Sequence, residues 1–455
     1  MASSRKSTLQ SLADRVSAAS LPLIPEGSSI LIGLSGGVDS VVLLHLLHQL
    51  APLFSWKLSA LHVHHGISPN ANAWADFCKA LCAEHDVPLC IERVDIAPLR
   101  SQGIEAAARQ LRHTAFAAQL CDVVALAHHA DDQVETLFLQ LLRGAGVKGA
   151  SAMPALSDAN VSKHAAVEAH QFWRPLLHCT RQEILDYASA HDLQWIEDES
   201  NGDDSYPRNF LRHRLLPVLS QRFPAYRETL TRSTQHFSEA GKLLDELAQM
   251  DAGECVDTLS VTALKALSES RAKNLLRYFL HRRGATMPQV VQLDEMLHQL
   301  CGAREDAGVC IRFGEWQVRR YRSRIYALRT PGDYDRNLVL PWMGEAVLNW
   351  PALNSQVQFQ ASRAQGISLT KLQRATVTVR FRKGGERLQP TLKGATRTLK
   401  NLLQEHAIPP WERDRWPLIY CGDDLVCVPG VAVSESYQAR NGEAAVAVFL
   451  SAVLC

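Results

Sequence analysis

The hexapeptide Ser35-Gly36-Gly37-Val38-Asp39-Ser40 has residue types suited to binding an anion. Gly36 and Gly37 let backbone N–H groups approach a phosphate closely, and a helix beginning here adds the positive end of its dipole. Ser35 and Ser40 can add hydroxyl donors. The Gly-Lys-Ser/Thr ending of a Walker A loop is absent, and so is G-x-G-x-x-G. The pattern therefore predicts a pyrophosphate site, with ATP cleaved between its α and β phosphates and Asp39 binding Mg²⁺. The alternative is a glycine-rich turn with a capping serine.

A second group of reactive side chains lies in the segment Ala127-His128-His129-Ala130-Asp131-Asp132-Gln133-Val134-Glu135-Thr136. Asp132 and Glu135 are three residues apart, which places them on one face of a helix. Two carboxylates near a helix start can bind a metal ion or a cationic substrate. The two histidines can bind metal, orient a phosphate or transfer protons. The helix dipole alone also favours acids in a first turn. This segment therefore indicates a functional site only in combination with the anion site.

Three weaker groups accompany these two. His62-Val63-His64-His65-Gly66 follows an expected strand, where a loop could contact a nucleotide. Gly103 to Arg109 opens an expected helix, and Arg109 and Arg112 could bind phosphates; an ion pair between Glu105 and Arg109 is the structural alternative. Asp198 to Asn201, followed by Arg208 to Arg212, has the spacing of a loop before a solvated basic helix.

The elements that must position these groups alternate between strand and helix. Strands are expected at 29–34, 57–63, 89–94 and 122–127, and helices at 40–50, 72–85, 104–120 and 131–143. This alternation predicts βαβ units and a doubly wound parallel sheet of the α/β class. Ligands of such sheets bind beyond the carboxyl ends of the strands, where all of the groups above fall.

The remainder of the chain predicts two further domains. A loop is expected at 157–171, a helix opened by the capping box Thr180 to Glu183, and helices from 217 to 302 with a break near Gly253. A hairpin around Gly314 and a weakly patterned stretch lead to a last β/α region from 375. We expect a catalytic domain at 1–217, a mainly helical middle domain at 218–340 and a small basic α+β domain at 341–455.

Composition excludes several classes of protein. The chain has 455 residues, of which 46% are apolar and 21% charged, as in soluble globular proteins. Neither a secretory signal nor an apolar run of about 20 residues is visible, so we expect a cytoplasmic protein without membrane contact. Eleven cysteines without a C-x-x-C pair predict neither a zinc ribbon nor a disulfide framework. Residues 361–420 hold twelve Lys or Arg against four acids, and 271–283 hold five basic residues without an acid, which suits a polyanion.

Together these motifs resemble the N-type ATP pyrophosphatases, or PP-loop enzymes, and within them the tRNA(Ile)-lysidine synthetases. The first motif, SGGVDS, is shared by the whole PP-loop class, whereas HHADDQVET with LLRGAG, and RNFLR, are much narrower. The resemblance spans about residues 29–435 and includes HVHHGIS with Trp74, GIEAAAR, DESN, and the C-terminal segments Gly384 to Leu388, Lys400 to Leu403 and Ile408 to Arg413. Ala150 stands where the family often has Leu.

The resemblance implies a two-step reaction. ATP adenylates C2 of the wobble cytidine in a CAU-anticodon isoleucine tRNA, and the lysine ε-amine then displaces AMP. Ser35 to Ser40 would hold the pyrophosphate, Asp39 and Glu135 would bind Mg²⁺, and Asp132 with Glu135 would hold the lysine ammonium. Arg109 and Arg208 would steady the adenylated base or its phosphate. The amine proton would pass to the Asp132/Glu135 pair or to His129, a choice that stays open.

The tRNA also needs contacts outside the reaction centre. Two basic stretches are the candidates, and their residues are Arg271, Arg277, Arg380, Arg382, Lys383 and Arg387. A homodimer is left open.

Three alternatives fit the sequence less well. A PP-loop tRNA thiolase usually needs a cysteine pair or an iron–sulfur site near the motifs. A glutamine-dependent amidotransferase needs a glutaminase domain. A tRNA-binding protein with an inactive PP-loop would keep the basic stretches but lose the carboxylates Asp39, Asp132 and Glu135, which are all present.

Overall fold

A computed structural model describes residues 12–20, 22–158, 170–253, 257–304, 307–330, 332–363, 366–390 and 395–452. The chain divides into two compact units. The first comprises Met1–Glu254 and Ser268–Gly284, and the second Cys255–Leu267 and Ala285–Cys455. This division differs from the expected boundaries at 217 and 340, because the long helix α10 (Tyr226–Ala252) packs against helices of the first unit. The three-domain boundaries stay a prediction.

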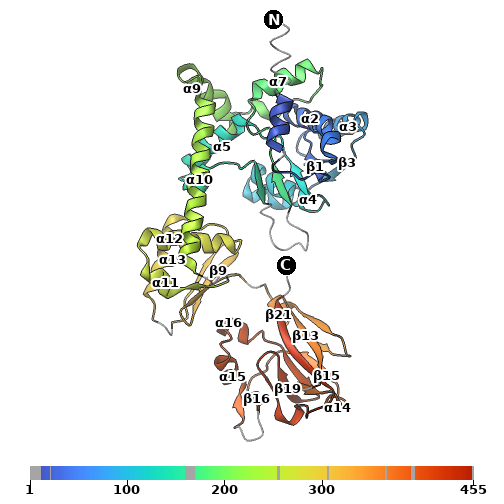
Figure 1. The fold of residues 1–455 in the computed structure, drawn as a ribbon, viewed down its shortest axis with the longest axis vertical. Coiled ribbons are helices and arrows are strands. Elements are labelled where there is room, and N and C mark those ends of the chain that lie inside the picture. Colours follow the sequence, from blue (N-terminus) through green and yellow to red (C-terminus); the bar gives the residue numbers. More distant parts are fainter. Residues whose placement is uncertain are drawn as a thin grey trace. The chain divides into compact units, whose positions relative to one another are not determined.

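A six-stranded sheet forms the centre of the first unit (Figure 1). Its strands are β1 (Ser29–Gly33), β2 (Lys57–His64), β3 (Leu89–Arg93), β4 (Val123–Ala125), β5 (Leu156–Asp158) and β6 (Gln171–Trp173). They lie in the order β3-β2-β1-β4-β6-β5, and only β5 runs antiparallel to its neighbour. The predicted doubly wound parallel sheet is confirmed. β5 and β6 lie at the two ends of the loop expected at 157–171, and residues 159–169 of that loop are outside the described residues.

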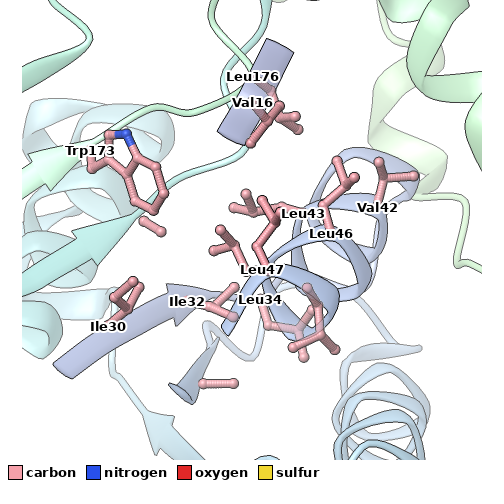
Figure 2. Close-up of a cluster of buried hydrophobic side chains, with 14 of the residues drawn as sticks. Val16, Ile30, Ile32, Leu34, Val42, Leu43, Leu46, Leu47, Trp173 and Leu176 are labelled. Atoms are coloured by element: carbon pink, nitrogen blue, oxygen red, sulfur yellow. The ribbon is translucent and has the colours of Figure 1, made fainter. Parts of the chain in front are cut away.

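Helices cover both faces of this sheet because successive strand residues point to opposite sides. Ile30 and Ile32 of β1 pack with α2 (Val38–Phe54), α3 (Ala71–Glu84) and α7 (Arg181–Ala190) in one buried cluster (Figure 2). Leu31, between them, packs on the other side against α4 (Ile104–Ala117). Each fully buried aliphatic side chain contributes about 1.5–3 kcal/mol, so both faces hold the strand ends firmly in place.

The remaining elements of the first unit lie mostly along the chain after β4. The α-helices are α5 (Ala130–Leu142), α6 (Val147–Ala150), α8 (Pro207–Phe210), α9 (Leu216–Arg222) and α12 (Glu269–Arg282). A π-helical turn, η3 (Leu211–Leu215), joins α8 to α9, and the 3-10 turns are η1 (Ala97–Gln102) and η2 (Glu199–Gly202). The helix α10 packs against α5, α6 and α12.

The second unit begins with a small α/β layer. Its elements are β7 (Leu259–Ser260), α11 (Val261–Ala266), α13 (Val290–Gly302), β8 (Cys310–Phe313), β9 (Trp316–Tyr321) and β10 (Arg324–Arg329). The four strands form an antiparallel sheet in the order β7-β10-β9-β8. The expected hairpin around Gly314 is therefore part of a larger antiparallel sheet.

The C-terminal part of this unit contains two further antiparallel sheets, of five and four strands, around one core that includes Trp350 and Val379. Their strands are β11 (Val339–Pro341), β12 (Val347–Trp350), β13 (Ser355–Ser362), β14 (Ile367–Ser368), β15 (Val377–Arg380), β18 (Leu418–Cys421), β19 (Asp424–Val428), β20 (Ala432–Val433) and β21 (Ala445–Ala452). The other elements are η4 (Pro351–Leu353), α14 (Leu369–Leu372), β16 (Arg387–Leu388), β17 (Arg397–Thr398), α15 (Leu399–Glu405), α16 (Pro410–Arg413) and η5 (Glu435–Tyr437). The small α+β domain is confirmed, although its strands start near 339, within the stretch that looked weakly patterned.

Among the described residues, no helix has the length and apolar character needed to cross a membrane.

Candidate active site

The hexapeptide forms a tight loop between β1 and α2. Gly36 has φ +91°, and a Cβ at this position would lie 2.7 Å from Cδ1 of Ile196. The Ile196 N–H also donates to the carbonyl of Gly36 at 2.9 Å, so only glycine allows this close approach. The first backbone N–H groups of α2 have no partner within a helix, which leaves the helix start available to an anion.

The hydroxyl of Ser40 holds this loop in shape. It donates to the carbonyl of Gly37 at 2.9 Å and accepts the N–H groups of Ser35 at 3.2 Å and Gly36 at 3.1 Å. The hydroxyl of Ser35 lies 3.1 Å from that of Ser40 and accepts the Gly37 N–H at 3.3 Å. In this structure both hydroxyls therefore fix the backbone that faces an anion. Direct contacts of the Ser35 and Ser40 hydroxyls with phosphate stay a prediction.

Three carboxylates surround the buried imidazole of His129 at the start of α5. Its Nε2 lies 3.8 Å from Oδ1 of Asp39 and 3.5 Å from Oδ2 of Asp132, and its Nδ1 lies 3.7 Å from Oδ2 of Asp131. The backbone N–H of His129 donates to Oδ2 of Asp132 at 3.1 Å, which fixes that carboxylate at the helix start. Residues 90 positions apart in sequence thus meet because β1 and β4 are parallel neighbours with their carboxyl ends at one edge.

Glu135 lies one turn further along α5 and is completely buried. Its Oε1 accepts Nε of Arg212 at 2.7 Å, and its Oε2 accepts NH2 of Arg212 at 3.1 Å. Nε of Arg208 lies 3.1 Å from the same Oε2. Two arginines from α8 and the π-helical turn therefore neutralise one carboxylate, and Arg212 also reaches Oδ1 of Asp132 at 3.5 Å.

Burial perturbs all three acids that the sequence singled out. Burial raises the pKa of Asp39, although His129 and Arg181 partly oppose this. Burial also raises the pKa of Glu135 despite its hydrogen bonds with Arg212. For Asp132, burial acts in the same direction, but the charges of His129, His128 and Arg208 prevail and its pKa is lowered. Acids with separated pKa values are typical of reaction centres.

The donor set fits a divalent cation at Asp39 only in part. Oδ1 of Asp39 is buried and has no hydrogen-bond partner, which is unfavourable unless a cation or substrate completes it. In the described part of the chain, no group of three or more His, Cys, Asp or Glu side chains is arranged to hold a metal ion. Mg²⁺ usually takes one or two carboxylates and completes its shell with phosphate oxygens and water, so Asp39 beside a phosphate site suits it. Glu135 could serve as a ligand only after its arginine partners moved away.

Three arginines lie near His128, which belongs to the second group of reactive side chains. His128 follows β4, and its pKa is lowered by burial and by the charges of Arg174, Arg208 and Arg109. Because Arg208 and Arg109 both act on His128, the structure brings both arginine candidates to the carboxyl edge of the sheet. Arg109 is an exposed residue of α4.

The two remaining weak groups are largely structural. The ring of His62 shares a hydrogen bond with the carbonyl of Leu34 at 3.0 Å, and His64 lies 3.2 Å from Asn72. Glu199, in the Asp198 to Asn201 segment, hydrogen-bonds with Asn70.

A cavity of about 300 Å³ is lined by Glu135 and by other side chains of α5, α7, α9 and α10. Its charged lining consists of two acids and three arginines, namely Asp131, Glu135, Arg181, Arg212 and Arg227. Asp131 is paired with Arg227 and accepts the backbone N–H of Arg181 at 2.9 Å, while Glu135 is paired with Arg212. The Arg181 side chain has only a distant contact, 3.9 Å, with Asp39. One guanidinium is thus left for an anionic group.

The candidate tRNA-contacting residues fall in both units. In the first unit, Arg271 is paired with Asp251, whereas Arg277 is exposed on α12. In the second unit, Arg380 stacks over Tyr420 at 3.9 Å, and Arg382 lies 3.3 Å from Asp414. Lys383 and Arg387 are exposed. Their contacts with RNA stay a prediction.

Sequence reasoning assigned no role to three arginines that the structure places at the reaction centre. Arg212 stands in the quoted RNFLR motif, four residues after Arg208, and that spacing could have identified it. Arg181 was visible only as part of a capping box. Arg174 follows a three-residue strand that the sequence did not reveal.

Comparison with known proteins agrees with this geometry. A PP-loop domain model matches residues 6–219, a TilS substrate binding domain model matches 259–326, and a TilS substrate C-terminal domain model matches 377–449. The tRNA(Ile)-lysidine synthase of Nitrosomonas europaea is 44% identical over 91% of this chain and 90% of its own length. Those of Escherichia coli O157:H7 and Coxiella burnetii are 40% and 37% identical, covering 90% and 92% of this chain and 94% and 92% of their own.

Such identity over nine-tenths of both chains extends well beyond the nucleotide loop that all PP-loop enzymes share. All three matched domains occur in the same order along one chain. The protein therefore belongs to the tRNA(Ile)-lysidine synthase family.

Proposed function

We propose that this protein joins L-lysine to C2 of the wobble cytidine in a CAU-anticodon isoleucine tRNA, converting ATP to AMP and pyrophosphate through an adenylated tRNA. The observation that carries the proposal is the meeting of the glycine-rich loop with Asp39, His129 and Asp132 at one sheet edge. Its proposed location is the cytoplasm. The other two matched domains support tRNA as the acceptor.

The first step needs a site for the pyrophosphate that leaves. The backbone of Ser35 to Gly37, shaped by Ser40, presents N–H groups and the start of α2 to that charge. The loop has no lysine, so its amides and helix dipole supply most of the local positive potential. Bound Mg²⁺, held by Asp39, would offset negative charge on the phosphates. Arg109 and Arg208 steady the activated nucleotide.

The second step needs a site for lysine. The cavity behind Glu135 has a suitable size for an amino acid and a charge pattern that matches one. In this proposal Arg181, the least engaged of its arginines, binds the α-carboxylate, and the ε-amine extends toward Glu135 and Asp132. Glu135 can accept the amine proton more readily than an ordinary glutamate because burial raises its pKa, provided that Arg208 and Arg212 release an oxygen. Asp132 and His129 are the alternative acceptors.

The thiolase alternative receives no support from the described cysteines. Burial raises the pKa of Cys78, the cysteine near the loop, to about 12 and that of Cys179 to about 11. Both thiols are therefore protonated at neutral pH and poor nucleophiles.

The test is incorporation of radiolabelled lysine into isoleucine tRNA transcripts bearing CAU, with a methionine tRNA transcript as control. Label in the isoleucine transcript alone, with one AMP formed per lysine, is the expected result. Asp39→Ala should abolish both products while leaving tRNA binding intact. Turnover by Asp39→Ala at the wild-type rate, or label in the methionine transcript at equal rate, would contradict the proposal.

A further inference from the structure

A buried arginine that has no acidic partner among the described residues lies beside the reaction centre. Arg174 is only 8% exposed. One of its terminal nitrogens donates to the carbonyl of Pro154 at 2.9 Å and to the hydroxyl of Ser157 at 3.2 Å. Its Nε is buried without a hydrogen-bond partner, and among the described residues no carboxylate pairs with it. A buried charge is unfavourable unless something neutralises it.

Within the described chain, the charged side chain that acts on Arg174 is another arginine. Burial, and to a smaller extent the positive charge of Arg109, lowers the pKa of Arg174 to about 10. The ring of Phe172 on β6 packs against those of His113 and Phe116, which places α4 directly over this strand. Because α4 runs against the strands, its first turns, with Arg109, lie at the same carboxyl edge as Arg174.

The sheet order separates this cluster from the pyrophosphate loop. Trp173, just before Arg174, is in register with Ala125 of β4, and β4 pairs with β1 on its other side. Two strand spacings therefore lie between Arg174 and the end of β1, about 10 Å. The arginine pair sits on the side away from β2, beyond His128. A phosphate bound here would therefore lie outside the loop that holds the diphosphate.

We propose that Arg174 and Arg109 form a phosphate-binding pair that holds a backbone phosphodiester of the acceptor RNA next to the activated base. This inference rests on the proposed function, since it takes RNA as the acceptor. Arg174 is a positioning residue: it fixes the nucleotide so that its base reaches Asp132 and Arg208. A phosphate of the bound ATP has the same chemistry and is the competing occupant.

The test compares Arg174→Gln and Arg174→Lys in the full-length enzyme, with Arg15→Gln as the control. Arg15 forms an ion pair with Glu183 on the opposite side of the sheet, away from the proposed site. For each variant, kcat and KM for ATP and for the isoleucine transcript are measured between 50 and 200 mM salt. Fluorescence anisotropy gives tRNA affinity over the same range.

The expected result for Arg174→Gln is a drop of roughly 10- to 100-fold in kcat/KM for tRNA, the worth of a hydrogen bond to a charged group. KM for ATP should stay within twofold. The salt slope of tRNA affinity should fall by about 0.7, as for one lost contact with a single-stranded phosphate. Arg174→Lys should retain the wild-type slope, and Arg15→Gln should match wild type throughout.

Other outcomes overturn the inference. A raised KM for ATP with an unchanged salt slope would assign the phosphate to the nucleotide. Equal losses for both substrates with the slope unchanged would make Arg174 purely structural. If Arg174→Gln does not fold, Arg109→Gln on the exposed helix should show the reduced slope, and its failure to do so would refute the pair. If the wild-type enzyme attaches no lysine, the proposed function fails, while the anisotropy slopes still decide on the phosphate site.

Discussion

The buried group of Glu135, Arg208 and Arg212 gives a quantitative prediction for stability. Glu135 is 0% exposed and Arg212 25%, and their two contacts are 2.7 and 3.1 Å. Removing one member of a fully buried pair costs about 3–5 kcal/mol because the other charge is stranded. Water can reach part of Arg212, so we expect about 2–3 kcal/mol for Glu135→Ala, or a melting point lower by about 5–10 °C.

A double-mutant cycle isolates the interaction from other effects of truncation. Glu135→Ala, Arg212→Ala and the double variant are compared by urea-dependent hydrogen exchange of peptides covering Ala130–Leu142 in the full-length protein. The double variant should be little worse than either single one, with a coupling of about 2 kcal/mol. Lys148 and Asp245, an exposed pair 2.6 Å apart, serve as control and should couple by less than about 1 kcal/mol. Additivity within about 0.5 kcal/mol at Glu135 and Arg212 would refute the reasoning.

Three further predictions follow from single contacts. Gly36→Ala should lower kcat/KM for ATP by at least about 10-fold and destabilise the loop, because its Cβ would lie 2.7 Å from Ile196; Gly146→Ala, with open space around it, should match wild type. Asp39→Asn should remove turnover without lowering the melting point, since the change removes a half-buried carboxylate whose pKa is raised and whose Oδ1 has no hydrogen-bond partner; a marked loss of stability would contradict this. Burial, then the charges of His191, His85 and His48, lowers the pKa of His45 from 6.5 to about 4, so the unfolded chain binds this proton more readily. The stability present above pH 6.5 should decrease as the pH falls toward 4, and His45→Gln should flatten the dependence of melting point on pH between 7 and 5.

The sequence predicted the parts of the site that depend on periodicity and on strand ends. Alternating strands and helices up to residue 143 were correct, and a parallel sheet necessarily brings Asp39 and Asp132 to one edge. Pairings between distant side chains were not predictable. Arg227 reaches Asp131 across 96 positions, through the packing of α10 on α5, and no local pattern encodes that contact. Strands of three residues such as β6 are too short to show alternation, which is why Arg174 was missed.

Because of the π-helical turn Leu211–Leu215, the number of residues in this segment matters for the site as well as their types. The turn accommodates one extra residue between the arginine of α8 and the helix that follows. Deleting that residue would restore ordinary α-helical winding, and the residues of the turn would shift while the helix after it kept its direction. Arg212 lies within the turn, so its contacts with Glu135 would change although the other residues were preserved. A one-residue gap at this turn in a related sequence therefore predicts a changed environment of Glu135, even where the surrounding letters agree.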